Sequence, residues 1–124
     1  TKTMKQLIFQ AVLLGLLVLV SATSFAQGKS NTVKTDTLTV FGNCGQCKTR
    51  IEEAAYVKGV KTAEWNKKTK ILTVVYNQQK CNLDNIAGAI AQAGHDSRIK
   101  TASDKNYKTL PGCCAYRTGT CDHD

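Results

Sequence analysis

Aromatic side chains are scarce in this chain, and its basic residues are not gathered around them. Only 6% of the 124 residues are aromatic, although 17 Lys and Arg face 9 acidic residues and give a net charge of +8. Proteins that bind single-stranded nucleic acids usually stack bases on aromatic side chains beside a basic groove. The composition therefore argues against a nucleic-acid partner. It favours a solvated basic surface, or one that docks on an acidic protein domain.

The first 26 residues contain neither acidic residues nor cysteine. A nearly unbroken apolar run at positions 7–20 follows Lys5, and Ser24-Phe25-Ala26 fits the small-x-small pattern of a cleavage site. The run is short for a membrane span, no basic stop-transfer cluster follows it, and no cysteine near Ala26 points to a lipoprotein. We expect residues 1–26 to be a secretory signal peptide cleaved after Ala26. An uncleaved N-terminal anchor is the alternative.

Cleavage would leave a small basic protein. Of the 17 basic residues, Lys2 and Lys5 would be lost, leaving 15 against 9 acidic residues and a net charge of +6. Residues 27–33 are polar and read as a linker. We expect a periplasmic or secreted monomer with no stable membrane association after cleavage. Its core is so modest that bound metal or disulfides would add materially to its stability.

Strand and helix signals alternate from residue 34 to residue 101, the predicted domain. Periodicity and turn residues predict strands at 35–41, 60–66, 71–76 and 95–100 and a helix at 47–57. A second helix is expected between a cap at Asn82 and a left-handed terminator at Gly94. The order βαββαβ predicts an α+β, ferredoxin-like fold, in which two helices cover one face of a four-stranded antiparallel sheet.

Cys44-Gly45-Gln46-Cys47 stands between the first predicted strand and the first predicted helix. A helix N-terminus has unpaired N–H groups and a positive dipole end, which stabilise thiolate over thiol. Thiolate is both the nucleophile and the metal ligand of cysteine. The spacing therefore indicates a metal or redox site at a strand-to-helix turn.

These residues and several later ones resemble the heavy-metal-associated domain family. The similarity spans residues 33–101 and rests on Gly42-Asn43-Cys44-Gly45-Gln46-Cys47, Ile51-Glu52, Gly59-Val60, Ala89-Ile90 and Ala93-Gly94-His95. The family includes soluble copper chaperones, the periplasmic mercury-binding protein and modules of metal-pumping ATPases. The resemblance implies that Cys44 and Cys47 bind a soft cation. It also implies transfer of the ion by ligand exchange to another metal-binding domain or a metal-transporting membrane protein, without catalysis.

The chain departs from the family pattern just before the first thiol. The family usually has Gly-Met-x-Cys there, whereas this chain has Phe41-Gly42-Asn43-Cys44. The methionine that normally anchors the loop in the core is absent, and Phe41 is the candidate to fill its space.

His95 follows the predicted helix terminator at a position that, by resemblance, lies close to the loop that carries the two cysteines, residues 41–47, called the metal loop below. A neutral imidazole there would complete a trigonal Cu(I) site or a tetrahedral zinc site, or would tune the charge of the thiolates. The alternative is a histidine at a strand end in contact with solvent.

The C-terminal tail, residues 102–124, is rich in candidate ligands. It contains Cys113, Cys114, Cys121 and His123, and its Leu-Pro-x-Cys-Cys-x-Tyr pattern is similar to the ending of some exported heavy-metal-associated proteins. We expect either an auxiliary soft-metal site or an arm that folds over the first loop. The alternative is a disulfide staple, since six cysteines in an oxidising compartment could form three bridges. Cys81, before the second helix, is expected to be a structural or spare thiol.

Ligand softness narrows the choice of metal. Thiolates with at most one imidazole select Cu(I), Hg(II), Zn(II) or Cd(II) over Mg or Ca. We favour Cu(I), with Hg(II) and Zn(II) as alternatives, because a two-cysteine loop provides a linear or trigonal site without a closed cage. A thiol-disulfide redox protein is the rival reading, since Cys-x-x-Cys at a helix start also serves thioredoxins. Against it, the strand order differs and the single proline, Pro111, lies in the tail.

Overall fold

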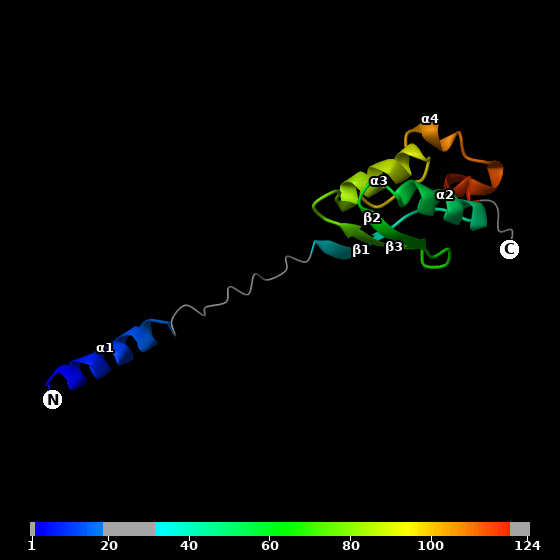
Figure 1. The fold of residues 1–124 in the computed structure, drawn as a ribbon. Helices are drawn as coiled ribbons and strands as arrows, with labels where there is room; N and C mark the ends of the chain where they lie inside the picture. The colour runs from blue at the N-terminus through cyan, green and yellow to red at the C-terminus, as the bar shows by residue number, and fades with distance from the viewer. Residues whose placement is uncertain (1, 19–31, 120–124) are drawn as a thin grey trace. The chain divides into compact units, whose positions relative to one another are not determined.

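The structure, a computed structural model, describes residues 2–18 and 32–119. The chain divides into two compact units, Thr1–Ser30 and Asn31–Asp124. In the first unit the described residues form helix α1, Lys2–Val18 (Figure 1). In the described ranges, no helix combines the length and apolar character needed to cross a membrane. The expected cleavage site, Ser24-Phe25-Ala26, lies outside the described residues.

A three-stranded antiparallel sheet forms the base of the second unit. Its strands are β1 (Val33–Thr39), β2 (Val60–Trp65) and β3 (Ile71–Asn77), arranged in the order β1-β3-β2. The strands predicted at 60–66 and 71–76 are confirmed and form an antiparallel hairpin, in which Ala63 pairs with Val74 and Trp65 with Leu72. The inward faces of both strands are buried, as alternation of apolar and polar residues requires.

The polar turn of this hairpin is held by Asn66. Its side-chain oxygen accepts the backbone N–H groups of Lys68 at 2.9 Å and Thr69 at 3.0 Å. This is the turn chemistry expected of asparagine, which offers the backbone a local acceptor in place of a strand partner. Lys70 then takes a positive φ of 62° and leads into β3.

Helix α2, Gly45–Ala55, begins two residues earlier than the pattern predicted and ends two residues earlier. Its buried residues are Cys47, Ile51 and Ala55, which share one face at helical spacing. The helix ends at Tyr56, and the chain reverses through Gly59, whose φ of +108° suits glycine.

Helix α3, Leu83–Gln92, has the predicted boundaries. Asn82 is its N-cap and forms a reciprocal capping box with Asn85, with N–H···O distances of 2.8 and 3.0 Å. Gly94, with a φ of +99°, provides the left-handed residue just beyond its C-terminal end. Figure 1 shows α2 and α3 on one face of the sheet, the arrangement that buries both amphipathic faces at once.

The fourth strand expected at residues 95–100 is reduced to a single bridge. Val40 pairs antiparallel with Ser97. Immediately afterwards the Ser97 N–H and hydroxyl both donate to the Lys100 carbonyl, at 2.7 and 3.2 Å, and close a tight turn. The turn therefore uses the Ser97 N–H and the Lys100 carbonyl, which a longer strand would pair with a neighbouring strand. The α+β class with two helices on an antiparallel sheet is confirmed, but the described residues form a three-stranded sheet, one strand fewer than expected.

The tail folds back onto the domain as far as it is described. It forms a short helix, α4 (Asp104–Tyr107), and two 3-10 turns, η2 (Gly112–Cys114) and η3 (Tyr116–Thr118). The turn η2 lies against α2, and Figure 1 shows this red segment beside that helix. The described tail therefore belongs to the same compact unit as the sheet.

Candidate metal centre

Cys44 and Cys47 lie in the first turn of α2. Cys44 is the N-cap residue, with extended backbone angles, and its carbonyl accepts the N–H of Lys48 at 3.1 Å. Because Cys47 follows three positions later, both side chains lie at the same end of the helix, and their sulfurs are 3.3 Å apart. The predicted strand-to-helix placement of the two thiols is therefore observed.

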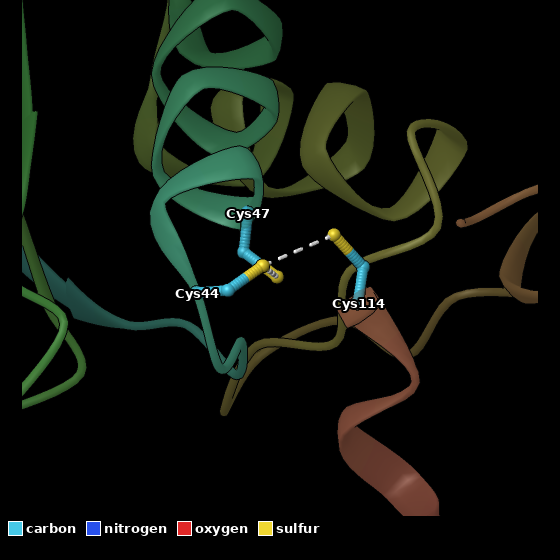
Figure 2. A group of neighbouring side chains, drawn as sticks. All are labelled: Cys44, Cys47 and Cys114. Carbon is cyan, nitrogen blue, oxygen red and sulfur yellow. Dashed lines mark hydrogen bonds between the residues drawn. The ribbon is translucent and has the colours of Figure 1, made fainter. Parts of the chain in front are cut away.

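Cys114 brings a third sulfur to this pair. It projects from η2 and is completely buried, with its sulfur 3.6 Å from that of Cys44. The three sulfurs all lie within 4.8 Å of one another. Figure 2 shows Cys44 and Cys47 at the end of α2 with Cys114 facing them from the tail. Residues 70 positions apart in the sequence thus form one cluster of thiols.

Cys44 and Cys114 differ in how readily they ionise. Burial raises the pKa of Cys44, but the backbone N–H of Cys47 and the neighbouring thiols outweigh burial and lower this pKa to about 7. Burial and the two loop sulfurs raise the pKa of Cys114 far above the usual range of a thiol. Near neutral pH Cys44 is therefore partly thiolate and Cys114 is a thiol that donates to it. A metal ion held by all three must displace the Cys114 proton, so binding should strengthen as pH rises.

The donor set decides what this cluster can hold. Three thiolates without a carboxylate favour soft ions and disfavour magnesium or calcium. Three sulfurs suit trigonal coordination, whereas a structural zinc site is usually closed by four ligands. The described residues contain no second group of three such ligand atoms.

Trp65 anchors the metal loop in the core. Its side chain is only 1% exposed, and its ring N–H donates to the Val40 carbonyl at 3.0 Å. A Cβ placed on Gly42 would lie 3.1 Å from the Trp65 ring and 2.9 Å from the Cβ of Cys47. Gly42 is therefore required where the family has methionine, because the Trp65 ring and the Cys47 side chain leave no room for a larger residue.

Phe41 does not take the place of that methionine, so this expectation was wrong. It is 41% exposed. Lys70 instead supports the loop from the sheet side, since its ammonium donates to the Gly42 carbonyl at 2.6 Å and lies 5.5 Å from the centre of the Trp65 ring. The Trp65 indole, from β2, lies where a side chain at position 42 would have to fit.

Tyr116 fixes the tail to the end of α3. Its hydroxyl accepts the Asp96 N–H at 2.7 Å and donates to the Gly94 carbonyl at 2.9 Å. Its ring stacks on His95 at a centroid distance of 5.4 Å and an interplanar angle of 18°. These contacts hold η3 in place and thereby help to position Cys114, two residues earlier.

Arg117 adds an ion pair to the same attachment. It donates to both carboxylate oxygens of Asp96, at 2.7 and 2.8 Å, and to Asp104 at 3.0 Å. Its guanidinium also lies 4.3 Å from the centre of the Tyr107 ring. Burial raises the pKa of Asp96, but Arg117 and the N–H of Ala102 outweigh burial and hold this pKa below its usual range.

We expect Arg117→Ala to loosen the tail. A lost charge-assisted pair of this kind costs about 1–3 kcal/mol of unfolding free energy. Arg117→Lys should be intermediate, because lysine keeps the charge and loses the two-pronged geometry. Denaturant unfolding measures the stability, and peptide mapping after alkylation measures how fast Cys114 is labelled. The labelling rate should rise in the alanine variant.

Exposed Arg98 offers the control for this experiment, since Arg98→Ala removes an equal charge without touching the pair. The folded pKa of Asp96 is depressed, so the stabilisation is present above its unfolded pKa and lost as pH falls through the folded value. The stability gap between wild type and Arg117→Ala should close there. Unchanged Cys114 labelling in Arg117→Ala would contradict the attachment described above.

His95 is fully buried and is not a member of the three-sulfur group. Its Nδ1 lies 2.9 Å from the Phe41 carbonyl. A carbonyl only accepts hydrogen bonds, so Nδ1 carries the proton, and Nε2 finds no partner within the described part of the chain. Burial is the main reason that the pKa of His95 is lowered. The solvent-contact alternative is wrong, because His95 is buried and its ring donates to the backbone carbonyl of Phe41 in the metal loop.

The remaining predicted ligands fall in different places. Cys113 is half-buried beside the cluster, and its thiol donates to the Gln46 side-chain carbonyl at 3.2 Å. Cys113 and Cys44 are close enough to influence each other's pKa. Cys121 and His123 lie outside the described residues. The five described cysteines, Cys81 included, are all free thiols.

Sequence reasoning missed the residues that support the cluster. Trp65 and Lys70 lie on and beside a hairpin that carries no motif, and Arg117 follows the Cys-Cys pair without a recognisable pattern. The available signal for Trp65 was its status as the single tryptophan, on an inward strand position. The glycine at the family's methionine position pointed to a compensating large residue elsewhere.

Comparison with known proteins gives one curated relative and several similar structures. The chain is 33% identical over 89 residues to the mercuric transport protein periplasmic component of Shewanella putrefaciens, covering 71% of this chain and 93% of that protein. The CopZ metallochaperone structure shares 30% identity at a TM-score of 0.50, covering 52% of this chain and 98% of its own. Oxidized MerP from Ralstonia metallidurans CH34 shares 28% identity at a TM-score of 0.50, covering 52% and 93%. No protein-family model matches the chain.

This chain covers almost the whole length of each of these relatives, and together with the 33% identity to the curated relative this establishes the family to which the chain belongs. The chain belongs to the heavy-metal-associated family of metal-binding proteins that includes these copper and mercury proteins, which confirms the resemblance seen in the sequence. Each solved structure matches about half of this chain.

Proposed function

We propose that this protein binds one soft metal ion through the sulfurs of Cys44, Cys47 and Cys114. It then passes the ion to a partner or sequesters it in the cell envelope, as a carrier and not as an enzyme. The observation that carries the proposal is the cluster of three buried sulfurs within 4.8 Å of one another at a helix N-terminus. A soft ion gains three ligands there without any large movement of the chain.

Cu(I) is the ion we favour. It accepts trigonal sulfur coordination, and a site without a fourth ligand stays open to attack by an incoming thiolate. Zinc would need a further donor to complete a tetrahedron. The mixed protonation of the cluster also supports a carrier, because protons can replace the ion when it leaves.

Hg(II) is the second candidate. The match covers 93% of the length of the curated relative, which is the periplasmic component of a mercuric transport protein. A thiophilic divalent ion would use the same three sulfurs. The two candidates therefore differ in the ion carried and share the site.

The cell envelope is the proposed location. The periplasmic relative supports it, as do the signal-peptide pattern of residues 1–26 and the linker of residues 27–33. We propose that residues 34–101 act as a monomeric heavy-metal-associated domain, with the bridge of Val40 and Ser97 as the trace of its fourth strand. The partner would be a metal-transporting membrane protein or another metal-binding domain.

The other predicted donors receive supporting roles in this proposal. The buried His95 holds the loop through the Phe41 carbonyl and can serve as a donor only if Nε2 turns toward the sulfurs. Cys121 and His123 are the candidates for an auxiliary site in residues 102–124.

Native mass spectrometry of residues 27–124 tests the proposal. Free thiols are counted in the protein as isolated, and the protein is then reduced and loaded in turn with Cu(I), Hg(II) and Zn(II). We expect one tightly held Cu(I) or Hg(II). Competition against a Cu(I) chelator should show binding weakened by at least about a hundredfold in Cys114→Ser, because loss of a direct ligand should cost no less than loss of an outer-shell group, which costs about 10–100-fold.

Cys81→Ser is the matched control, because Cys81 is buried beside Gly59 and is not part of the cluster. It should bind Cu(I) like wild type. A reduced protein that takes up no soft ion would refute the carrier, and thiols found paired would favour a redox or disulfide-stapled protein instead.

A further inference from the structure

The three site sulfurs are shielded from an incoming protein thiolate. Cys44 is 5% exposed, and Cys47 and Cys114 are completely buried. An ion arriving on a partner's thiolates must meet a sulfur at the surface first, since transfer between thiolates needs direct contact between the ion and the attacking sulfur.

Cys113 is the thiol placed to make that first contact. It precedes Cys114 in η2 and is half-exposed, and the carbonyl of exposed Gln46 accepts its thiol proton at 3.2 Å. Gln46 lies between Cys44 and Cys47 in the metal loop. The hydrogen bond therefore holds the Cys113 sulfur over the loop, beside the buried cluster.

The tail itself offers no easy alternative route. It is fastened by the hydroxyl of Tyr116 and by the two-pronged contact of Arg117 with Asp96. Exposing Cys114 would require breaking these contacts together. A path through Cys113 leaves them intact.

We propose that Cys113 is the entry and exit thiolate of the site, which receives the ion from a partner and passes it to Cys44, Cys47 and Cys114. This inference rests on the proposed function and adds the route to it. Cys113 is a transient ligand here, and the resting ion stays on the three buried sulfurs.

The exchange balances without a redox step. The Cys113 thiol gives its proton to the departing donor thiolate as a metal–sulfur bond forms to Cys113 and one bond to the donor breaks. Cys44, as its thiolate, and Cys47 then bind the ion as the last bond to the donor breaks, and the Cys47 proton passes to that departing donor thiolate. Cys114 replaces Cys113 last, and the Cys114 proton passes to Cys113. The oxidation state of the metal is unchanged throughout.

A ligand that holds the ion only during transfer affects the rates of loading and release. It does not change the affinity of the final three-sulfur site. Stopped-flow absorption in the Cu(I)–thiolate band follows loading of the reduced protein from Cu(I)–glutathione and release to a Cu(I) chelator. Cys113→Ser and Cys113→Ala should slow both directions by the same factor, at least about tenfold, with unchanged affinity. Cys81→Ser is the control and should exchange like wild type.

Two results would overturn the route. Wild-type exchange rates in both Cys113 variants would mean that the tail opens instead. An affinity lost as fully as in Cys114→Ser would make Cys113 a resident ligand. Both outcomes leave wild-type binding of Cu(I) in place, whereas failure of wild type to bind Cu(I) would overturn the proposed function itself.

Discussion

Cys47→Ser should lower the affinity for Cu(I) by more than about a hundredfold, because loss of even an outer-shell group of a metal site commonly costs 10–100-fold. Cys47 supplies one of the three sulfurs, and a serine hydroxyl is a poor ligand for a soft ion. Its sulfur also accepts the Asn43 N–H at 3.4 Å. Competition with a Cu(I) chelator under reducing conditions measures the change.

Folding should survive this substitution. Cys47 is completely buried beside Gly42, so a hydroxyl there costs about 1–3 kcal/mol. Unfolding in denaturant, measured without metal, separates this cost from the loss of a ligand. Cys47→Ala, which has no hydroxyl to bury, is the matched variant. If either variant kept wild-type affinity for Cu(I), the assignment of Cys47 as a ligand would fail.

Trp65→Ala should produce the largest loss of stability, about 3–5 kcal/mol, as truncation of a buried aromatic residue does. Trp65 packs on Gly42 and donates to the Val40 carbonyl. Its removal opens a cavity directly beneath the metal loop. The loop should then become mobile, and alkylation of Cys44 should speed up in the same variant.

Trp65→Phe separates packing from hydrogen bonding. Phenylalanine keeps most of the ring and leaves the Val40 carbonyl without its donor, so its cost should be nearer 1 kcal/mol. Unfolding in denaturant ranks the variants. A Trp65→Ala protein as stable as wild type, with unchanged Cys44 labelling, would show that the loop does not depend on this indole.

The parts of the fold that local chemistry determines were readable in the sequence. The cap at Asn82 and the terminator at Gly94 each follow from interactions within a few residues, and so does the break between the strands predicted at 60–66 and 71–76. The positions of Cys44 and Cys47 were predictable for the same reason, because they depend only on where a strand ends and a helix begins. Such features need no knowledge of distant contacts.

Features that depend on distant contacts were not readable. For the tail, the sequence allowed two interpretations. Only the folded structure shows that the sulfur of Cys114 lies beside that of Cys44, which is 70 residues away in the sequence. The anchor of the loop was assigned to Phe41 because it is adjacent, whereas Trp65 from β2 fills the space. The prediction of a fourth strand was wrong because Ser97 and Lys100 hydrogen-bond to each other and close a turn. The residue pattern of positions 95–100 does not reveal these bonds.

The most direct test of the three-sulfur site is X-ray absorption at the copper edge, on reduced protein loaded with one equivalent of Cu(I). We predict three sulfur neighbours in wild type and two in Cys114→Ser, with Cys81→Ser unchanged. Two sulfur neighbours in wild type would contradict the account. The tail would then close over the loop without binding the ion.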